Sequence, residues 1–290
     1  MRLKALVLLA ALVGAIAATA QAASVDIGHG RTLFLTCRGH GGPTVVLIAG
    51  FADAHGVWST GAAASPSVFA GTARFTRVCA YDRPGTSTDG RPGRSTPVHQ
   101  PTTARAAATD LAALLRAAHV PGPYVLVGHS YGGDIARVYA AEHPRSVAGL
   151  VLVDALSEAL PAGLTPEQLA VFESLNTPQN APPTAERVNW EGVFAELRHT
   201  PAARVPTVVL SADKPQLTPE VIAQGGLPPG VDEAFADALW AAQIAAQDKL
   251  ARRYPGSIHV TKTDSTHYIQ LEQPRLVTRW IRYVVRRARA

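Results

Sequence analysis

Short apolar runs rich in β-branched residues recur along the chain and alternate with longer segments of helical periodicity. A continuous apolar run bounded by Gly or Pro is typical of a strand that is buried on both faces. By this criterion, strands are predicted at residues 44–50, 77–82, 124–128, 149–154, 206–213 and 257–264. Upstream of them, "SVDIGHGRTLFLTC" predicts two further short strands joined by a Gly-containing turn.

Helical patterns separate these strands. They occupy the segments 102–118, 131–143, 232–253 and 276–286. In the last segment an apolar stripe backs a face of arginines, which predicts a terminal helix packed on a sheet; a helix lying on a membrane surface is the alternative. Strands that alternate with helices imply an α/β protein with a mostly parallel sheet covered on both sides.

Two stretches interrupt the alternation. Residues 156–204 are rich in Pro, Glu and Asn, and residues 215–255 hold a Pro/Gly loop before their helical pattern. Long insertions in compact domains are usually lids or binding loops. We therefore predict a lid or cap at about 156–204.

The first 22 residues have the three parts of a secretory signal: Arg2 and Lys4, an apolar stretch up to Ala18, and small residues at the expected cleavage site. An uncleaved anchor is the alternative, but the stretch is short for a membrane span, which needs about 20 apolar residues. We expect an exported protein, with one folded domain at 23–290 and no membrane span once the signal is removed.

Composition narrows the class of protein further. The 290 residues are 47% hydrophobic and 17% charged, which is typical of a globular chain, with a formal net charge of +5. Lys and Arg are scattered without a dense run before the last helix, so nucleic acid is not an expected partner. Cys37 and Cys79 lie in two strand-like runs, and an even count in an oxidising compartment favours a disulfide; two buried free thiols are the alternative.

The hexapeptide "GHSYGG" (128–133) carries the strongest chemical signal. An apolar strand runs into Gly-x-Ser-x-Gly, and a helical pattern begins at the serine. Glycines two residues before and after Ser130 leave room for a sharp turn that strains the serine backbone. Such a turn, the nucleophile elbow, exposes a serine hydroxyl at the carboxyl edge of a sheet.

At these residues the chain resembles the α/β-hydrolase superfamily, particularly its secreted serine esterase-like members. The resemblance rests on "VVLIAGFADAHGVW", "RVCAYDRPGTS", "GHSYGG", "GLVLVDA" and "DSTHYIQLEQP", in the expected order. It implies an eight-stranded, mostly parallel sheet with helices on both faces, and Ser130 as the nucleophile. It also implies the chain order serine, acid, histidine, so that His267, after the last predicted strand, is the general base.

The acidic residue that would orient His267 has two main candidates, each at the end of a predicted strand. The resemblance usually places it shortly after the strand that here ends in "VVLSA", where Asp213 comes about two residues early. In other members it lies at the end of the preceding strand, where Asp154 is in good register. We favour Asp154, with Asp213 as the alternative acid and Glu158 as a third candidate.

The resemblance also implies an oxyanion hole made of two backbone N–H groups. Tyr131, after the nucleophile, and Phe51, in the loop after the strand at 44–50, are expected to supply them. The His-Gly that often props this loop is replaced by Ala49-Gly50. For the substrate pocket we consider three aromatic residues: Trp58, Trp190 and Phe194.

The expected function is hydrolysis of small carboxylic esters through an acyl-enzyme, with no metal or cofactor, since HExxH, paired-Cys and phosphate-loop patterns are absent from the sequence. A serine at the elbow argues against the aspartate-based chemistry of haloalkane dehalogenases and epoxide hydrolases. Two alternatives stay open: a non-catalytic binding protein and a peptidase or amidase. The amine of a peptide substrate would need acidic groups, for which the candidates are Glu173, Glu191 and Glu196. The sequence predicts no oligomeric state.

Overall fold

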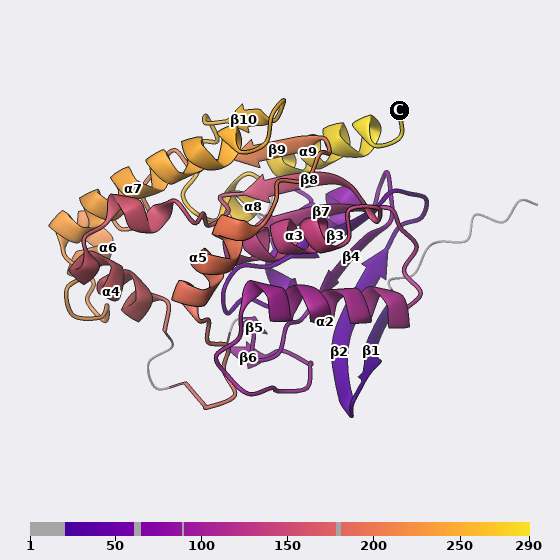
Figure 1. The fold of residues 1–290 in the computed structure, drawn as a ribbon, viewed down its shortest axis with the longest axis horizontal. Helices are drawn as coiled ribbons and strands as arrows, with labels where there is room; N and C mark the ends of the chain where they lie inside the picture. The colour runs from indigo at the N-terminus through magenta and orange to yellow at the C-terminus, as the bar shows by residue number, and fades with distance from the viewer. Residues whose placement is uncertain (1–20, 61–64, 89, 178–180) are drawn as a thin grey trace, which may run out of the picture.

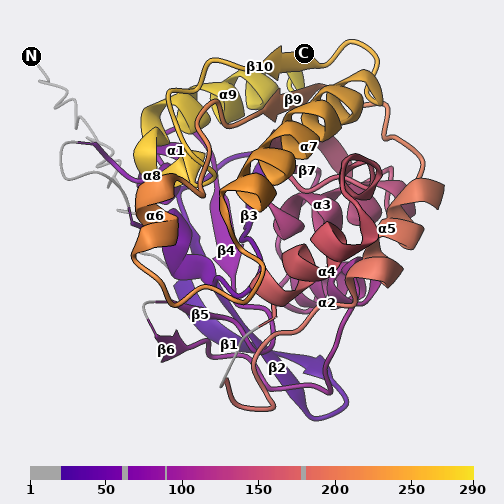
Figure 2. The same ribbon diagram turned by 90° about the vertical axis from the view of Figure 1, so that its left-hand side faces the viewer.

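The computed structural model describes residues 21–60, 65–88, 90–177 and 181–290. Residues 1–20 of the predicted signal lie outside the described residues. The first strand begins at Gln21. The described part of the chain forms a central sheet with helices on both faces, as Figures 1 and 2 show.

The sheet has eight strands and is mostly parallel, as predicted. From one edge to the other its strands are β1 (Gln21–Gly28), β2 (Arg31–Arg38), β4 (Val78–Tyr81), β3 (Thr44–Ile48), β7 (Tyr124–His129), β8 (Val147–Val153), β9 (Thr207–Leu210) and β10 (Ile258–Val260). Strand β2 runs antiparallel to both of its neighbours, β1 and β4; the six strands from β4 to β10 pair in parallel. Strands β5 (Ser87–Thr88) and β6 (Arg91–Pro92) form a separate small hairpin.

The last two strands of the sheet are shorter than the segments 206–213 and 257–264 predicted for them. Ser211 still donates its N–H to the Val260 carbonyl oxygen, but beyond it the chain leaves the ladder, and the Asp213 carboxylate accepts backbone hydrogen bonds from Thr263 and Ser265 instead. A side chain that binds nearby backbone amides offers them an alternative to the sheet.

Each face of the sheet is covered by its own helices because strand side chains alternate between faces. Val46 and Ile48 of β3 belong to one apolar cluster and Val45 and Leu47 to the other. The first face carries α2 (Ala104–Ala117), α3 (Tyr131–Glu142), α5 (Trp190–His199) and α7 (Glu233–Arg252). The second carries η1 (His55–Trp58), α1 (Val68–Thr72), α8 (Ile269–Glu272) and α9 (Pro274–Arg287).

Helix α9 packs on the sheet as predicted for a terminal helix. Val277, Ile281 and Val284 are fully buried, while Arg279 and Arg282 are exposed. Within the described ranges, no helix combines the length and the apolar character that crossing a bilayer requires.

Helices outside the two layers gather at one end of the molecule (Figures 1 and 2). These are η2 (Leu160–Gly163), α4 (Pro166–Leu175) and α6 (Pro219–Ala223), next to the first half of α7. Gly163 lies so close to α7 that a Cβ there would stand 2.6 Å from the Ala242 Cβ. The two insertions therefore pack against each other. We call these helices the cover; they include part of the second insertion, where the sequence analysis predicted no lid.

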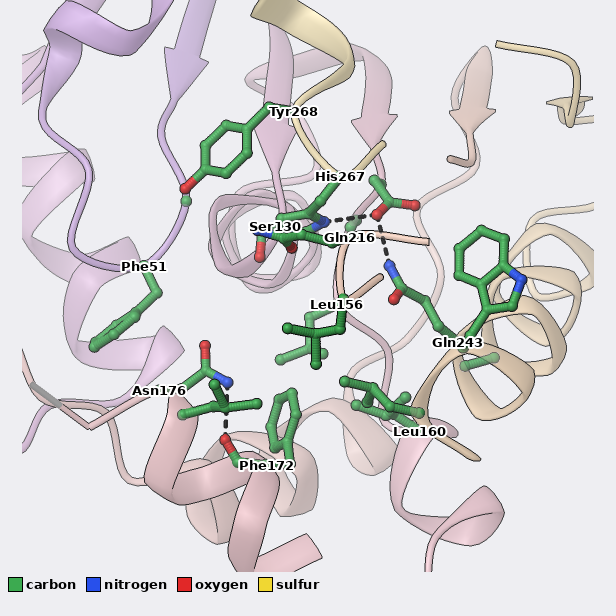
Figure 3. A pocket seen from close by; sticks show the side chains of 18 of the residues that line it. Phe51, Ser130, Leu156, Leu160, Phe172, Asn176, Gln216, Gln243, His267 and Tyr268 are labelled. Carbon is green, nitrogen blue, oxygen red and sulfur yellow. Dashed lines mark hydrogen bonds and ion pairs between the residues drawn. The ribbon is translucent and has the colours of Figure 1, made fainter. Parts of the chain in front are cut away.

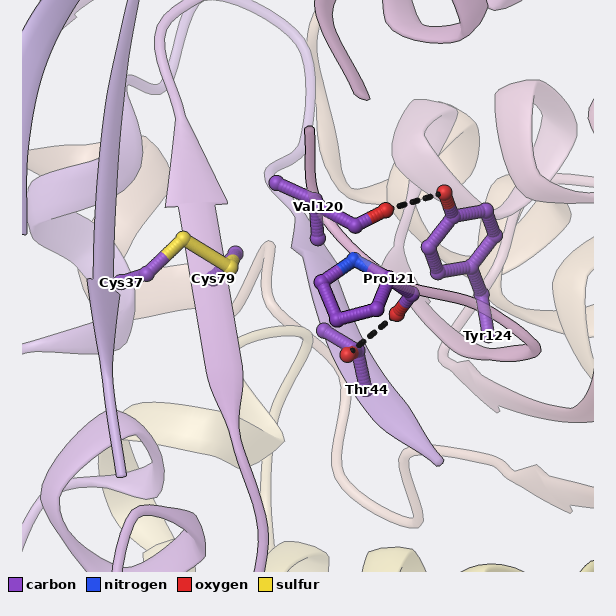
Figure 4. Close-up of a disulfide and its surroundings, with 6 residues drawn as sticks. All are labelled: Cys37, Thr44, Cys79, Val120, Pro121 and Tyr124. Atoms are coloured by element: carbon purple, nitrogen blue, oxygen red, sulfur yellow. Dashed lines mark hydrogen bonds between the residues drawn. A yellow bond between two sulfur atoms is a disulfide. The ribbon is translucent and has the colours of Figure 1, made fainter. Parts of the chain in front are cut away.

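Cys37 and Cys79 form a disulfide between β2 and β4 (Figure 4). The two residues are directly opposite each other in the antiparallel ladder, where Cβ atoms come close together. Of the two alternatives that the sequence left open, the structure has the bridge.

Candidate active site

Ser130 occupies the turn between β7 and α3. Its φ of +50° and ψ of −125° are unfavourable for a residue with a side chain. The Ser130 side chain does not cap the helix that follows it, and it borders a cavity of about 490 Å³. The strained turn thus presents the hydroxyl to the cavity, at the N-terminal end of a helix where developing negative charge is favoured.

The glycines of the motif are required by close backbone approaches. A Cβ on Gly128 would stand 2.3 Å from the Gly132 carbonyl oxygen, and a Cβ on Gly132 would stand 2.3 Å from that of Ile48. Both separations are shorter than any that Cβ atoms tolerate. The turn therefore excludes larger residues at both positions, for the steric reason anticipated from the sequence.

His267 is held by Asp154. The His267 Nδ1–H donates to Asp154 Oδ2 at 2.6 Å, as a dashed line in Figure 3 shows. Asp154 follows β8 directly and is almost completely buried. The Ala212 N–H donates to its other oxygen, Oδ1, at 2.9 Å, so the carboxylate is fixed from two sides.

A third donor reaches the same carboxylate. Gln243, on α7, donates its Nε2–H to Asp154 Oδ2 at 2.6 Å (Figure 3). Sequence analysis missed Gln243. The only signal for it is a polar pair one helical turn apart, Gln243 and Gln247, on a helix whose neighbouring positions are mainly apolar.

The other two acid candidates lie elsewhere. The Asp213 carboxylate accepts hydrogen bonds from the backbone N–H groups of Thr263, Asp264 and Ser265. Burial alone would raise the pKa of Asp213, but these donors hold it below its usual value. Asp213 thus fastens the loop that leads to His267. Glu158 is paired with Arg137 and Arg253 instead.

His129 supports His267 from the other side. Its Nε2–H donates to the His267 carbonyl oxygen at 3.0 Å, and the two rings lie 4.6 Å apart between centroids. Burial lowers the pKa of His129 well below its usual value, and the nearby His267 lowers it further. His129 is therefore a neutral donor that positions the His267 backbone.

The two residues expected to supply the oxyanion hole lie next to the turn at Ser130 or on the cavity wall. Phe51 follows β3 and lines the cavity, and Tyr131 is the first residue of α3. Among the described residues, neither amide has a hydrogen-bond acceptor. The pair is available to bind a negatively charged oxygen.

The loop that carries Phe51 is held by a buried ion pair. Arg83 donates to the carbonyl oxygens of Ala49 and Gly50 at 2.8 and 2.6 Å. Arg83 also pairs with Glu186 at 2.7 Å, and Glu186 accepts the Ala52 N–H at 2.6 Å. This pair props the loop that has Ala49-Gly50 in place of His-Gly. Glu186, in the lid segment, was not found from the sequence.

The cavity lies under the cover helices (Figure 3). Its apolar wall comes from both insertions: Leu156, Leu160, Phe172, Leu175, Leu217, Val221, Leu227, Leu239 and Trp240. Trp190, proposed as a pocket residue, lines it. Trp58 and Phe194 do not: each is buried in an apolar cluster, on opposite faces of the sheet, which corrects their assignment to the pocket.

None of the three glutamates proposed for binding an amine borders the cavity. The Glu196 carboxylate instead accepts the N–H of Arg105. In the described part of the chain, no group of three or more His, Cys, Asp or Glu residues is arranged to hold a metal ion.

Parts of this chain are similar in sequence to known proteins. The sequence model of the family described as "alpha/beta hydrolase fold" matches residues 43–181. The uncharacterized protein YqjL of Bacillus subtilis (strain 168) is 31% identical over 133 residues, which are 46% of this chain and 47% of that protein. The chain spans less than half the length of each curated relative that it matches.

Solved structures share the fold over nearly the whole chain. An N-acyl homoserine lactone degrading enzyme, Est816, has a TM-score of 0.61 at 19% identity, over 90% of this chain and 99% of that one. A thermophilic esterase from Thermogutta terrifontis has a TM-score of 0.57 at 22% identity, over 94% of this chain and 100% of that one. At these identities the likeness establishes the fold alone.

Proposed function

Because the chain belongs to the α/β-hydrolase superfamily, we propose that it is a serine hydrolase that cleaves carboxylic esters through an acyl-enzyme on Ser130. The observation that carries this proposal is the hydrogen bond from His267 Nδ1–H to the buried Asp154 carboxylate, beside a cavity that His267 shares with the strained Ser130. These are the parts that activation of a serine hydroxyl needs.

In the first step Ser130 Oγ attacks the ester carbonyl carbon while His267 Nε2 takes its proton. The hydrogen bond to Asp154 keeps the other ring proton on Nδ1, so that Nε2 is free to act as a base, and it stabilises the imidazolium that forms. The carbonyl oxygen becomes negatively charged and accepts hydrogen bonds from the N–H groups of Phe51 and Tyr131.

The tetrahedral intermediate then collapses. The bond to the alcohol oxygen breaks, and His267 returns its proton to that oxygen, which leaves an acyl group on Ser130. A water molecule, deprotonated by His267, attacks the acyl carbon; the bond to Ser130 Oγ then breaks, His267 returns the proton to that oxygen, and the carboxylic acid leaves.

Ester hydrolysis is favoured over the alternatives by the lining of the cavity. Apolar side chains from both insertions suit an acyl chain or another apolar group. The three glutamates considered for the amine of a peptide lie outside the cavity. The names of two proteins with the same fold, a lactone-degrading enzyme and an esterase, are consistent with this choice.

The test combines a fluorophosphonate probe with a panel of p-nitrophenyl esters and aminoacyl anilides. We expect wild type to be labelled and to prefer esters, and Ser130→Ala to lose both labelling and turnover. Asp154→Asn is expected to lower kcat by about 10⁴-fold, whereas Asp213→Asn keeps most of the activity and loses stability. Absence of labelling in the folded wild type would leave a non-catalytic binding protein as the better interpretation.

We also propose that the protein is exported, with residues 1–22 as the signal. The disulfide supports this, because such bonds persist in oxidising compartments. Mass spectrometry of the protein from the extracytoplasmic fraction is expected to show a mature chain that begins near Gln21 or Ala23. A full-length chain retained in the cytoplasm would contradict it.

A further inference from the structure

Asp53 places a carboxylate on the wall of the cavity. It lies two residues after Phe51 and lines the same cavity as Ser130 and His267. Its Oδ2 is buried and has no hydrogen-bond partner in the described part of the chain. An unsatisfied buried polar atom costs roughly 1–3 kcal/mol. Such a group at the wall of a binding cavity calls for an explanation in terms of what the cavity binds.

Arg83, the cation that acts most strongly on Asp53, is already paired with another carboxylate. Arg83 forms two hydrogen bonds with Glu186, at 2.7 and 2.9 Å, and donates its remaining bonds to backbone carbonyl oxygens. The charges of Arg83 and Glu186 therefore balance each other, and the negative charge of Asp53 has no cation of its own. Burial raises the pKa of Asp53 to about 6, and the charges of Arg83 and His267 and the Tyr268 hydroxyl only partly oppose this.

The remaining polar side chains of the cavity differ from Asp53. Asn176, Gln216 and Gln243 end in neutral amides, and Asp154 is bound by its three donors. Among the described residues that line the cavity, Asp53 is thus the one carboxylate left to bind a substrate.

Asp53 lies on the His267 side of the cavity. Tyr268 follows His267, and their ring centroids are 5.5 Å apart. The Tyr268 hydroxyl interacts with Asp53, and burial together with the Asp53 charge raises the Tyr268 pKa, which keeps the hydroxyl protonated. In the view of Figure 3, Tyr268 and Phe51 lie on one side of Ser130, and Leu160 and Gln243 on the other.

This placement assigns the two halves of the substrate. His267 must reach the oxygen of the leaving alcohol to protonate it, so the alcohol lies along the His267 and Tyr268 wall. The acyl group then lies in the apolar chamber around Leu156, Leu160 and Phe172.

We propose that Asp53 binds a protonated amine on the alcohol portion of the substrate, which makes the preferred substrates apolar acyl esters of amino alcohols. This inference rests on the proposed function. The ammonium N–H donates to the unpaired Asp53 oxygen, and the Tyr268 ring and hydroxyl border the same site. Asp53 acts in binding, and no covalent step passes through it.

The test compares two butanoate esters, the dimethylaminoethyl ester and the isopentyl ester, in which a protonated nitrogen replaces a CH group. A hydrogen bond to a charged group predicts that Asp53→Asn lowers kcat/KM for the amino ester by about 10- to 100-fold, and for the isopentyl ester by less than about threefold. Glu173→Gln, which removes a carboxylate outside the cavity, is the matched control and should change neither value.

Three results would overturn the proposal: an equal loss for both esters, no loss for either, or a selective loss only when the amine is moved to the acyl group. The first would make Asp53 a support of the Phe51 loop. Calorimetric binding of the amino ester to Ser130→Ala, with and without Asp53→Asn, separates the two proposals. It measures amine recognition even if no ester is hydrolysed, while fluorophosphonate labelling of Ser130 tests the hydrolase independently.

Discussion

Gln243 and Asp154 are joined by a hydrogen bond of 2.6 Å that connects the cover of the cavity to the carboxylate beneath it. Gln243 belongs to α7, the same helix that contributes Leu239 and Trp240 to the apolar wall. Its partner oxygen, Asp154 Oδ2, is the one that accepts from His267. A substrate that packs against α7 therefore contacts the element that also orients the proposed triad.

Gln243→Leu is expected to lower kcat about tenfold, with a smaller effect on KM. The variant leaves Asp154 Oδ2 with one donor fewer, and a hydrogen bond to a charged group contributes about 1.5–3 kcal/mol. Steady-state kinetics with a p-nitrophenyl ester measures this effect. Gln216→Leu is the matched control, since Gln216 lines the cavity without a hydrogen bond to Asp154. Equal kinetics for the two variants would show that the Gln243 bond does not orient the acid.

Arg83→Met is expected to destabilise the fold by about 3–5 kcal/mol, because it leaves the Glu186 carboxylate buried without its partner. Denaturant unfolding measures the change. The double variant Arg83→Met/Glu186→Leu should regain much of the stability, since replacing a whole buried pair by apolar residues is often neutral.

The double variant Arg83→Met/Glu186→Leu is expected to regain stability without regaining activity. The double variant lacks the bonds to the carbonyl oxygens of Ala49 and Gly50 and to the Ala52 N–H. The Phe51 N–H then loses its fixed position, and loss of one oxyanion donor typically costs about 10²–10³ in kcat. Recovery of both stability and kcat would show that the pair only stabilises the fold.

The turn at Ser130 and the sheet could be predicted because their signals are local. A buried strand is a contiguous apolar run, and the turn at Ser130 needs small residues at fixed offsets from it. The choice between Asp154 and Asp213 was not settled by sequence because both follow strands that end at the same edge of the sheet. Only the geometry of the loop before His267 separates them.

Side chains that pair across a long sequence separation give no local signal of this kind. Glu186 is 103 residues from Arg83, and Gln243 is 89 residues from Asp154. Each lies in an insertion, where the periodicity of the sheet does not fix which side chains meet. Trp58 was misassigned because it follows the Phe51 loop closely in sequence. A tryptophan at such a position looks the same in the sequence whether it packs into the core or lines a pocket.

Replacing the disulfide is expected to change stability without changing the chemistry. Cys37 and Cys79 are 42 residues apart in sequence, and opening a loop of this size costs about 2–4 kcal/mol. Cys37→Ser/Cys79→Ser should therefore unfold at lower denaturant concentration. Its kcat should match wild type at temperatures where both are folded, since neither cysteine lines the cavity. Wild type treated with reductant is the companion sample, and unchanged unfolding in both would contradict the expected role of the bond.

The preference for the amino ester over the isopentyl ester is expected to increase as pH rises through about 6. Burial raises the pKa of Asp53 to about 6 against the charge of Arg83, so the carboxyl is neutral below this pH and attracts a cation only above it. The chemical step is the same for both esters, so its own pH dependence cancels in the ratio of their kcat/KM values. Arg83 is paired with Glu186, and raised pKa values keep both Arg83 and Tyr268 protonated. In Asp53→Asn the ratio should be flat from roughly pH 5 to pH 7. If it still rises there, another group recognises the amine.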